Sequence, residues 1–214
     1  MKKSCIRILS LVLALCALCG ALTSCANKLK MKKDKFVSSK TGVEYSVVRS
    51  VYLPKSVSDE VYAVFEKNGV KIQYFEVEGL NPEEWLVSDQ NDFLYAGDIK
   101  TLPSFAEFGA NEMLVCHNSD VLFSFIDEKN ADQIAKIVER VSTVTPIEKN
   151  YYECNTYILA FASDKYPALY YRLKLAVTPD RTYVVDPSIG ANYDVTDLFA
   201  GYPDLVYQDD EYDE

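Results

Sequence analysis

The residues best suited to chemistry in the body of the chain are one histidine and two cysteines. His117 is the only histidine, and it directly follows Cys116, while Cys154 lies further along. A thiol next to an imidazole base can act as a nucleophile, but one histidine cannot supply the pair typical of zinc sites. Adjacent strand residues point to opposite faces, so Cys116 and His117 are not expected to meet, whereas Cys154 could approach His117 across strands. The pattern favours packed side chains, and we assign no catalytic residue.

The same two cysteines could form a disulfide if the protein works outside the cytoplasm. Cys116 and Cys154 both lie in apolar, strand-like stretches, where a thiol packs as a small hydrophobic group. A Cys116–Cys154 disulfide and two packed thiols therefore both stay open.

Carboxylates are numerous, and two groups of them lie close in sequence. Asp89 and Asp92 flank a polar loop, and Asp186, Asp194 and Asp197 lie within DPSIGANYDVTD. Calcium loops need regularly spaced oxygen ligands and a glycine turn, and neither segment has that spacing. Two carboxylates can also act together to hydrolyse glycosides, but no sequence motif identifies which two acidic residues would do so. Phosphate-binding glycine loops and serine-nucleophile motifs are absent as well. We therefore predict no metal site and no cofactor.

Aromatic residues are the remaining candidates for a binding surface. The chain has 16 tyrosines, including the pairs Tyr151-Tyr152 and Tyr170-Tyr171, and one tryptophan, Trp85. Tyrosine packs well in strands, which is the simpler explanation. Exposed aromatic rings also form rigid contact surfaces for proteins or sugars. These five residues are predicted to form such a surface.

The first 25 residues, MKKSCIRILSLVLALCALCGALTSC, hold the other four cysteines. A basic start is followed by an apolar run from Ile8 to Leu22, which is shorter than the roughly 20 residues that span a bilayer but suits a signal peptide. Leu22-Thr23-Ser24-Cys25 resembles the lipobox of bacterial lipoproteins. The resemblance implies that residues 1–24 are a signal peptide and that Cys25 is acylated. It also implies an extracytoplasmic protein anchored by lipid to the cell membrane. An uncleaved anchor and an ordinary secretory signal are the alternatives.

Charge is unevenly distributed after Cys25. Residues 26–40 contain six lysines and one aspartate, whereas the chain from Thr41 onward contains 13 basic and 31 acidic residues, a net charge of −18. Residues 25–41 are predicted to be the lipidated cysteine and a lysine-rich tether. Its basic side chains would lie against anionic headgroups or simply form a solvated spacer; they are Lys28, Lys30, Lys32, Lys33 and Lys35. The acidic body argues against nucleic acid as a partner.

The sequence pattern predicts that the secondary structure positioning these residues forms one α+β domain over residues 42–207. An acidic tail follows at 208–214. Apolar spacing predicts a helix from Val57 to Phe65, ended by Asn68-Gly69, and a second over Ala131–Val141. Asn81-Pro82 predicts a short helix carrying Trp85. Pro103–Phe108 is expected to be a helical turn. Mostly antiparallel strands are expected at 43–52, 70–78, 93–96, 113–116, 121–126, 154–163, 168–177 and 182–186, and the last three form a C-terminal meander.

These features favour a non-enzymatic module that binds a protein or glycan at the cell envelope. Two alternatives remain from the sequence. One is an envelope or extracellular glycan hydrolase using paired carboxylates, and the other is a structural or assembly subunit.

Overall fold

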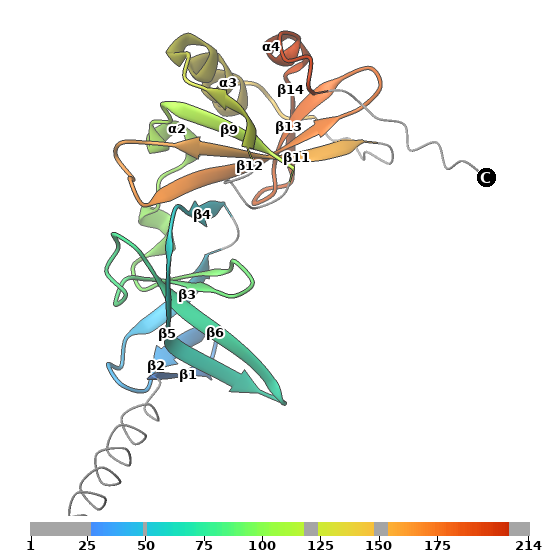
Figure 1. Ribbon diagram of the computed structural model, residues 1–214. Helices are drawn as coiled ribbons and strands as arrows, with labels where there is room; N and C mark the ends of the chain where they lie inside the picture. The colour runs from blue at the N-terminus through green and yellow to red at the C-terminus, as the bar shows by residue number, and fades with distance from the viewer. Residues whose placement is uncertain (1–26, 49–50, 118–123, 148–153, 206–214) are drawn as a thin grey trace, which may run out of the picture.

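The computed structural model describes residues 27–48, 51–117, 124–147 and 154–205. Two β-structures fill these ranges: a closed barrel formed by the first half of the chain and an open sheet formed by the second half (Figure 1). Cys25, Tyr151, Tyr152 and the tail 208–214 lie outside the described residues, as does the predicted signal peptide. Among the residues that are described, no helix is both long and apolar enough to cross a lipid bilayer.

Seven strands close the barrel in the order β1-β2-β3-β8-β7-β6-β5. All neighbours are antiparallel except β1 and β5, which run parallel and complete the ring with Leu29 opposite Phe65. A small apolar cluster fills the interior, made of Leu29, Phe36, Tyr45, Ala63, Phe65, Tyr74, Leu86 and Leu94. The strands are β1 (Asn27–Lys32), β2 (Lys35–Ser38), β3 (Glu44–Val48), β5 (Val57–Lys67), β6 (Val70–Val77), β7 (Trp85–Ser88) and β8 (Phe93–Tyr95).

The second sheet has the order β10-β9-β11-β12-β13-β14, with antiparallel neighbours throughout. Its strands are β9 (Glu112–Cys116), β10 (Ser124–Glu128), β11 (Asn155–Ala162), β12 (Leu169–Val177), β13 (Thr182–Asp186) and β14 (Ala191–Asp194). Helices α3 (Ala131–Thr143) and α4 (Thr196–Phe199) lie at the end of the molecule that is far from the barrel (Figure 1). The short elements η1 (Ile99–Thr101) and α2 (Phe105–Phe108) lead from β8 to β9.

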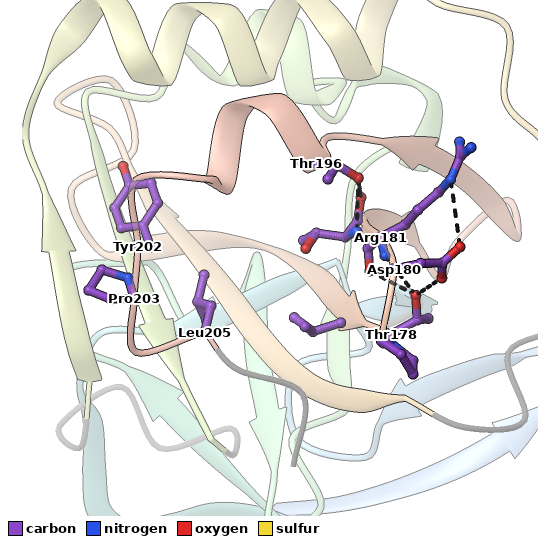
Figure 2. Close-up of a pocket in the computed structure, with 10 residues that line it drawn as sticks. Thr178, Asp180, Arg181, Thr196, Tyr202, Pro203 and Leu205 are labelled. Carbon is purple, nitrogen blue, oxygen red and sulfur yellow. Dashed lines mark hydrogen bonds and ion pairs between the residues drawn. The ribbon is translucent and has the colours of Figure 1, made fainter. Parts of the chain in front are cut away.

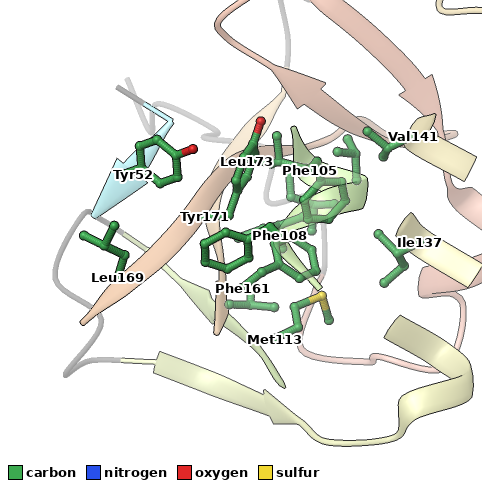
Figure 3. Close-up of a cluster of buried hydrophobic side chains, with 14 of the residues drawn as sticks. Tyr52, Phe105, Phe108, Met113, Ile137, Val141, Phe161, Leu169, Tyr171 and Leu173 are labelled. Carbon is green, nitrogen blue, oxygen red and sulfur yellow. The ribbon is translucent and has the colours of Figure 1, made fainter. Parts of the chain in front are cut away.

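Strand β4 (Tyr52–Pro54) joins the two structures. It follows barrel strand β3 in the chain, but it pairs with β12 of the second sheet, with Tyr52 opposite Tyr171. The main apolar cluster continues across this junction, from Trp85 and Phe93 of the barrel to Ile137 of α3. Figure 3 shows the part of the cluster in which Tyr52, α2 and β12 meet. Shared burial therefore holds the barrel and the sheet together.

The predicted α+β class is wrong, because 49% of the described residues are in strands and 15% are in helices. The largest error is the helix predicted over Val57–Phe65, a segment that lies within β5. Register shifts in the β5–β6 pairing, between Val57 and Val61 and again before Ala63, mark bulges or irregularities. A bulge inserts a residue and interrupts the alternating pattern. The apolar residues consequently fall at spacings of three and four, which resemble a helix.

Asn68-Gly69 is the hairpin turn between β5 and β6 rather than the end of a helix. Both residues have positive φ, 53° for Asn68 and 78° for Gly69. This backbone suits the two-residue turns whose twist matches antiparallel strands, and Asn-Gly is the preferred sequence there. The same dipeptide is also common after helices, so the local signal alone was ambiguous.

The short helix predicted to carry Trp85 is also wrong. Asn81 forms a single turn: its side-chain Oδ1 accepts the Glu83 N–H at 3.0 Å, and its carbonyl accepts the Trp85 N–H at 2.9 Å. Trp85 then begins β7, whose four residues are all buried. A strand buried on both faces replaces the helix, because Trp85 and Val87 pack in the main apolar cluster while Leu86 packs inside the barrel.

Strands β1 and β2 lie within the segment 25–41 that was predicted to be a tether. Lys28 and Lys30 alternate with Leu29, so β1 presents lysines outward while Leu29 packs in the barrel. Phe36 of β2 is buried in the same way. The high lysine content concealed an amphipathic strand, and the tether prediction for residues 27–38 is corrected accordingly.

Several elements were predicted correctly. Helix α3 is capped by Asn130, whose side chain accepts the N–H groups of Asp132 and Gln133. The helical turn predicted over Pro103–Phe108 is present as α2, which Gly109 ends with a φ of 69°. The antiparallel pairing of β11, β12 and β13 matches the predicted meander, which β14 extends.

Candidate functional site

The predicted aromatic surface does not form, because two of its members are core residues. Trp85 is 8% exposed and Tyr171 is 5% exposed, and both belong to the main apolar cluster. Tyr170 lies half-buried on the opposite face of β12, with the Lys55 ammonium 5.0 Å from its ring centre. Tyr151 and Tyr152 lie outside the described residues. Side chains alternate between the two faces of β12, so Tyr170 and Tyr171 lie on opposite faces of the sheet and cannot form one surface.

Cys116 and His117 point to opposite faces, as predicted. Cys116 packs in a small cluster with Leu114 and Ala160, whereas the exposed ring of His117 stacks on Phe125 at 4.6 Å. The described part of the chain therefore does not bring this thiol and this imidazole together.

Cys116 and Cys154 are both thiols in the structure. The β9–β11 register places Cys116 opposite Ile158, four residues after Cys154. At about 3.3 Å per residue, Cys154 lies about 13 Å away along the strand direction, well beyond the separation that a disulfide allows. Of the two possibilities that the sequence left open, the structure therefore has two separate thiols and not a disulfide. Burial raises the pKa of the Cys154 thiol, which opposes nucleophilic reactivity.

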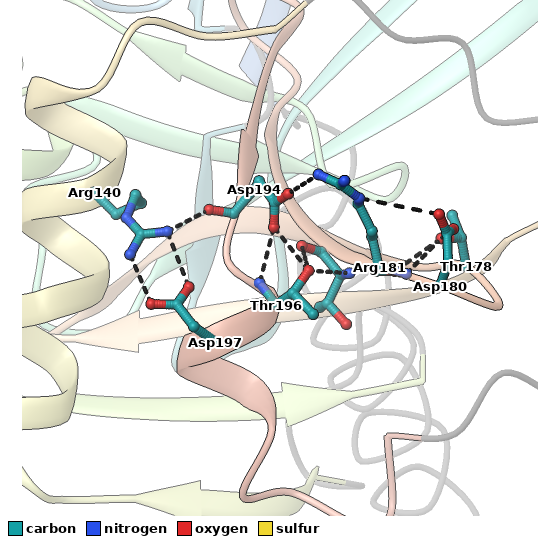
Figure 4. Close-up of polar contacts among 8 residues, drawn as sticks. Arg140, Thr178, Asp180, Arg181, Asp194, Thr196 and Asp197 are labelled. Atoms are coloured by element: carbon teal, nitrogen blue, oxygen red, sulfur yellow. Dashed lines mark hydrogen bonds and ion pairs between the residues drawn. The ribbon is translucent and has the colours of Figure 1, made fainter.

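Asp194 and Asp197 belong to an arginine network at the end of the second sheet (Figure 4). Arg140 donates to both carboxylate oxygens of Asp197, at 3.0 and 2.9 Å, and to the backbone carbonyl of Asp194 at 2.7 Å. Arg181 donates to the Asp194 carboxylate at 2.7 Å. The network ties α3 to the β14–α4 corner and the β12–β13 hairpin. Among the described residues, no cluster of three or more potential metal ligands is present.

The pKa values in this network follow from its hydrogen bonds. The bond from Arg140 lowers the pKa of Asp197. Burial alone would raise the pKa of Asp194, but hydrogen bonds from Thr196 and Arg181 outweigh it and lower that pKa. Both carboxyls are therefore ionised partners of arginines. A general acid for glycoside hydrolysis would need a raised pKa, which neither has.

A pocket of about 490 Å³ lies beside this network, between the β12–β13 hairpin and the residues after α4 (Figure 2). Its polar atoms already bond to one another: the Thr178 hydroxyl donates to Asp180 and accepts the Arg181 N–H. Tyr202 donates its hydroxyl to Glu128 at 2.5 Å. A ligand here would have to replace internal hydrogen bonds, so this pocket is a poor binding site.

A second cavity, of about 610 Å³, lies where the barrel meets the second sheet. We call it the junction groove. Its walls are mainly apolar, and its size lies within the range typical of small-molecule sites. Residues from five separate segments line it: Val47, Val48, Val51, Tyr52, Ile99, Lys100, Leu102, Pro103, Ser104, Glu107, Tyr171 and Ser188.

A few polar groups are placed around the apolar walls of the junction groove. The Tyr52 hydroxyl donates to the Pro103 carbonyl at 3.1 Å. Burial raises the pKa of both Tyr52 and Tyr171, so both phenols stay protonated. The Tyr52 hydrogen is already donated to the Pro103 carbonyl, so its oxygen can serve a ligand only as an acceptor. The Ser104 hydroxyl lowers the pKa of Glu107 by donating to its carboxylate at 2.7 Å, and that carboxylate stays charged.

Lys100 is the basic residue of the groove and is exposed at its edge. It makes no ion pair with any residue in the described ranges. Two of the lining residues are exposed apolar side chains, Val47 at 42% and Ile99 at 43%. Solvent-exposed apolar groups beside a cavity are typical of binding sites.

Sequence reasoning did not predict the junction groove, although it chose one of the lining residues, Tyr171. Its lining comes from β3, β4, the η1–α2 segment, β12 and the β13–β14 turn. Valine, proline and isoleucine in such segments are ordinary packing residues, and no spacing in the sequence links them. Only the pairing of β4 with β12 assembles the site.

Comparisons with known protein families, with curated protein sequences and with solved structures found no match for this chain.

Proposed function

We propose that the protein is a lipid-anchored, extracytoplasmic binding protein that holds an amphipathic small molecule in the junction groove. The observation that carries the binding proposal is the combination in one 610 Å³ cavity of apolar walls, two protonated tyrosines and a lysine at the edge. An apolar ligand body would fill the walls, and an acidic or hydrogen-bonding end would meet Lys100. The lipobox-like sequence ending at Cys25 supports the anchored location.

The glycan hydrolase alternative has weaker support. Glu139 and Asp197 line one pocket of about 520 Å³ beside α3, but Arg140 holds Asp197 ionised. The junction groove has one carboxylate, Glu107, which is committed to Ser104. Binding therefore fits the geometry of the described cavities better than two-carboxylate hydrolysis.

Ligand binding can be tested with anilinonaphthalene sulfonate, a probe with apolar rings and an acidic group. Trp85 is the only tryptophan and lies 5.9 Å from Tyr52 of the groove, so energy transfer from Trp85 reports a probe bound there. We expect saturable binding with quenching of Trp85 emission. Val47→Glu should weaken it by about tenfold or more, because a buried ligand would meet an unpaired charge.

Val144→Glu is the matched control, since Val144 has nearly the same exposure as Val47, 46% against 42%, and lies outside the groove. It should leave the affinity unchanged. Binding that is weakened equally by both variants, or by neither, would contradict a site in the junction groove.

The anchor is tested by Cys25→Ala, because acylation requires the thiol. We expect the parent protein to partition into the detergent phase and to incorporate labelled palmitate, and we expect the variant to do neither. Cys154→Ala is the control and should keep both properties. Unchanged palmitate incorporation in Cys25→Ala would refute the proposed lipidation site.

A further inference from the structure

The barrel carries a basic surface on a chain that is otherwise strongly acidic. Lys28, Lys30 and Lys32 occupy alternate positions of β1 and are all exposed, while Leu29 between them packs inside. Alternation therefore aligns the three ammonium groups on the outer face of one strand. The row of lysines starts at Lys28, three residues after Cys25.

The parallel pairing of β1 and β5 adds further lysines to this surface. Two adjacent parallel strands end at the same edge, so the turn after Lys32 and the turn after Lys67 lie side by side. Lys33 and Lys35 belong to the first hairpin, and Lys71 belongs to the second. A shallow groove of about 380 Å³ follows the seam and is lined by Lys28, Lys30 and Lys67 together with Glu66.

Each of the two hairpins also exposes an apolar side chain. Met31 is 45% exposed at the end of β1, and Val70 is 58% exposed and pairs with Lys67 across the second hairpin. Exposed apolar groups on hairpins that also carry lysines fit the boundary between headgroups and acyl chains. Lys35 contributes less than the others, because its ammonium already lies 3.8 Å from the Glu44 carboxylate.

We propose that this surface is a membrane-docking face that lies flat on anionic lipid headgroups, with Met31 and Val70 entering the interface. We call it the basic barrel face; it comprises Lys28, Lys30, Lys32, Lys33, Lys35, Lys67, Lys71, Met31 and Val70. The inference rests on the lipid anchor of the proposed function, which brings Cys25 and therefore β1 to the bilayer. The net charge of −18 from Thr41 onward disfavours an approach through the acidic remainder of the molecule.

Docking on this face would fix the orientation of the whole molecule. The second sheet lies on the side of the barrel opposite to β1, β2 and the β5–β6 turn (Figure 1). A barrel lying on the membrane through the basic barrel face therefore holds the second sheet away from the lipid.

The test uses protein purified from membranes and reconstituted into phosphatidylcholine vesicles containing about a third brominated phosphatidylglycerol. Bromine quenches indoles at the interface, so Val70→Trp should be quenched, whereas Val144→Trp, at the end of α3, should not. Combining Val70→Trp with Lys30→Glu, Lys32→Glu and Lys67→Glu should lower the ratio of docked to undocked barrels by about a hundredfold, since each lysine near an anionic surface contributes roughly fivefold. High salt should have the same effect.

Equal quenching of Val70→Trp and Val144→Trp would overturn the proposal, as would quenching that survives the three charge reversals. Vesicle flotation at high salt separates this outcome from failure of the anchor. A lipid-anchored protein floats at high salt whether or not the barrel docks, whereas an unanchored protein does not float.

Discussion

Tyr171→Ala is expected to lower the free energy of unfolding by about 3–5 kcal/mol, the usual cost of removing a buried aromatic side chain. The ring is 5% exposed and contacts the rings of Tyr52, Phe105 and Phe108 at centroid distances of 5.5, 5.1 and 5.5 Å. The cavity would open where β4, α2 and β12 meet, so relaxation would require three elements to move. Urea-induced unfolding followed by circular dichroism measures the loss.

Tyr170→Ala is the matched control, one residue away on the same strand. Tyr170 is half-buried on the other face, and its cation–π contact with Lys55 contributes about 0.5–1 kcal/mol. We expect a loss of at most about 2 kcal/mol. Equal losses in the two variants would contradict the assignment of the two rings to opposite faces.

Cys154 is expected to react with iodoacetamide at least about a thousandfold faster than Cys116 in the native protein. Cys116 is fully buried, so its thiol meets the reagent only when the sheet opens, and a stable domain populates such states at about one part in a thousand or less. Cys154 is only partly buried. Mass spectrometry of the modified peptides, sampled over time, measures both rates.

Denaturant provides the control for this labelling. In concentrated urea the two thiols should react at similar rates, because the fold no longer protects Cys116. Native labelling of Cys116 as fast as that of Cys154 would contradict its burial. A peptide linking the two cysteines under non-reducing conditions would contradict the β9–β11 register.

The elements predictable from the sequence were those defined by local chemistry. Asn130 at the start of α3 and Gly109 after α2 identify helix ends through their own side chain or backbone preference. The strands β11, β12 and β13 are separated by short turn-forming segments, so their antiparallel order follows from adjacency along the chain.

The barrel was not predictable because its defining contacts are not local. Closure depends on a parallel pairing between β1 and β5, which lie at opposite ends of the strand order. Irregular register in β5 produced a helical spacing, and the lysines of β1 resembled a tether. Each segment was interpreted from its own composition, whereas the deciding factor was burial inside a ring formed by seven strands.

The candidate site was even less accessible from the sequence. Reasoning from residue types selected Trp85 and Tyr171 as exposed aromatics, and burial in the main cluster excludes both from a surface role. Tyr171 nevertheless lines the junction groove as part of its wall. The sequence can suggest that an aromatic residue binds a ligand. Only the packing shows whether its ring faces a cavity or lies within the core.

Strand β4 also has a consequence for the order in which the protein is made and folded. The last barrel strand ends at Tyr95, so all seven barrel strands are synthesised before the strands β9 to β14 of the second sheet. Tyr52–Pro54 is synthesised with them, yet its partner, Leu169–Tyr171, comes close to the end of the chain. The barrel can therefore close while a short apolar strand at its edge waits for its partner. The junction groove, which includes Tyr52 and Tyr171, is completed only at that last step.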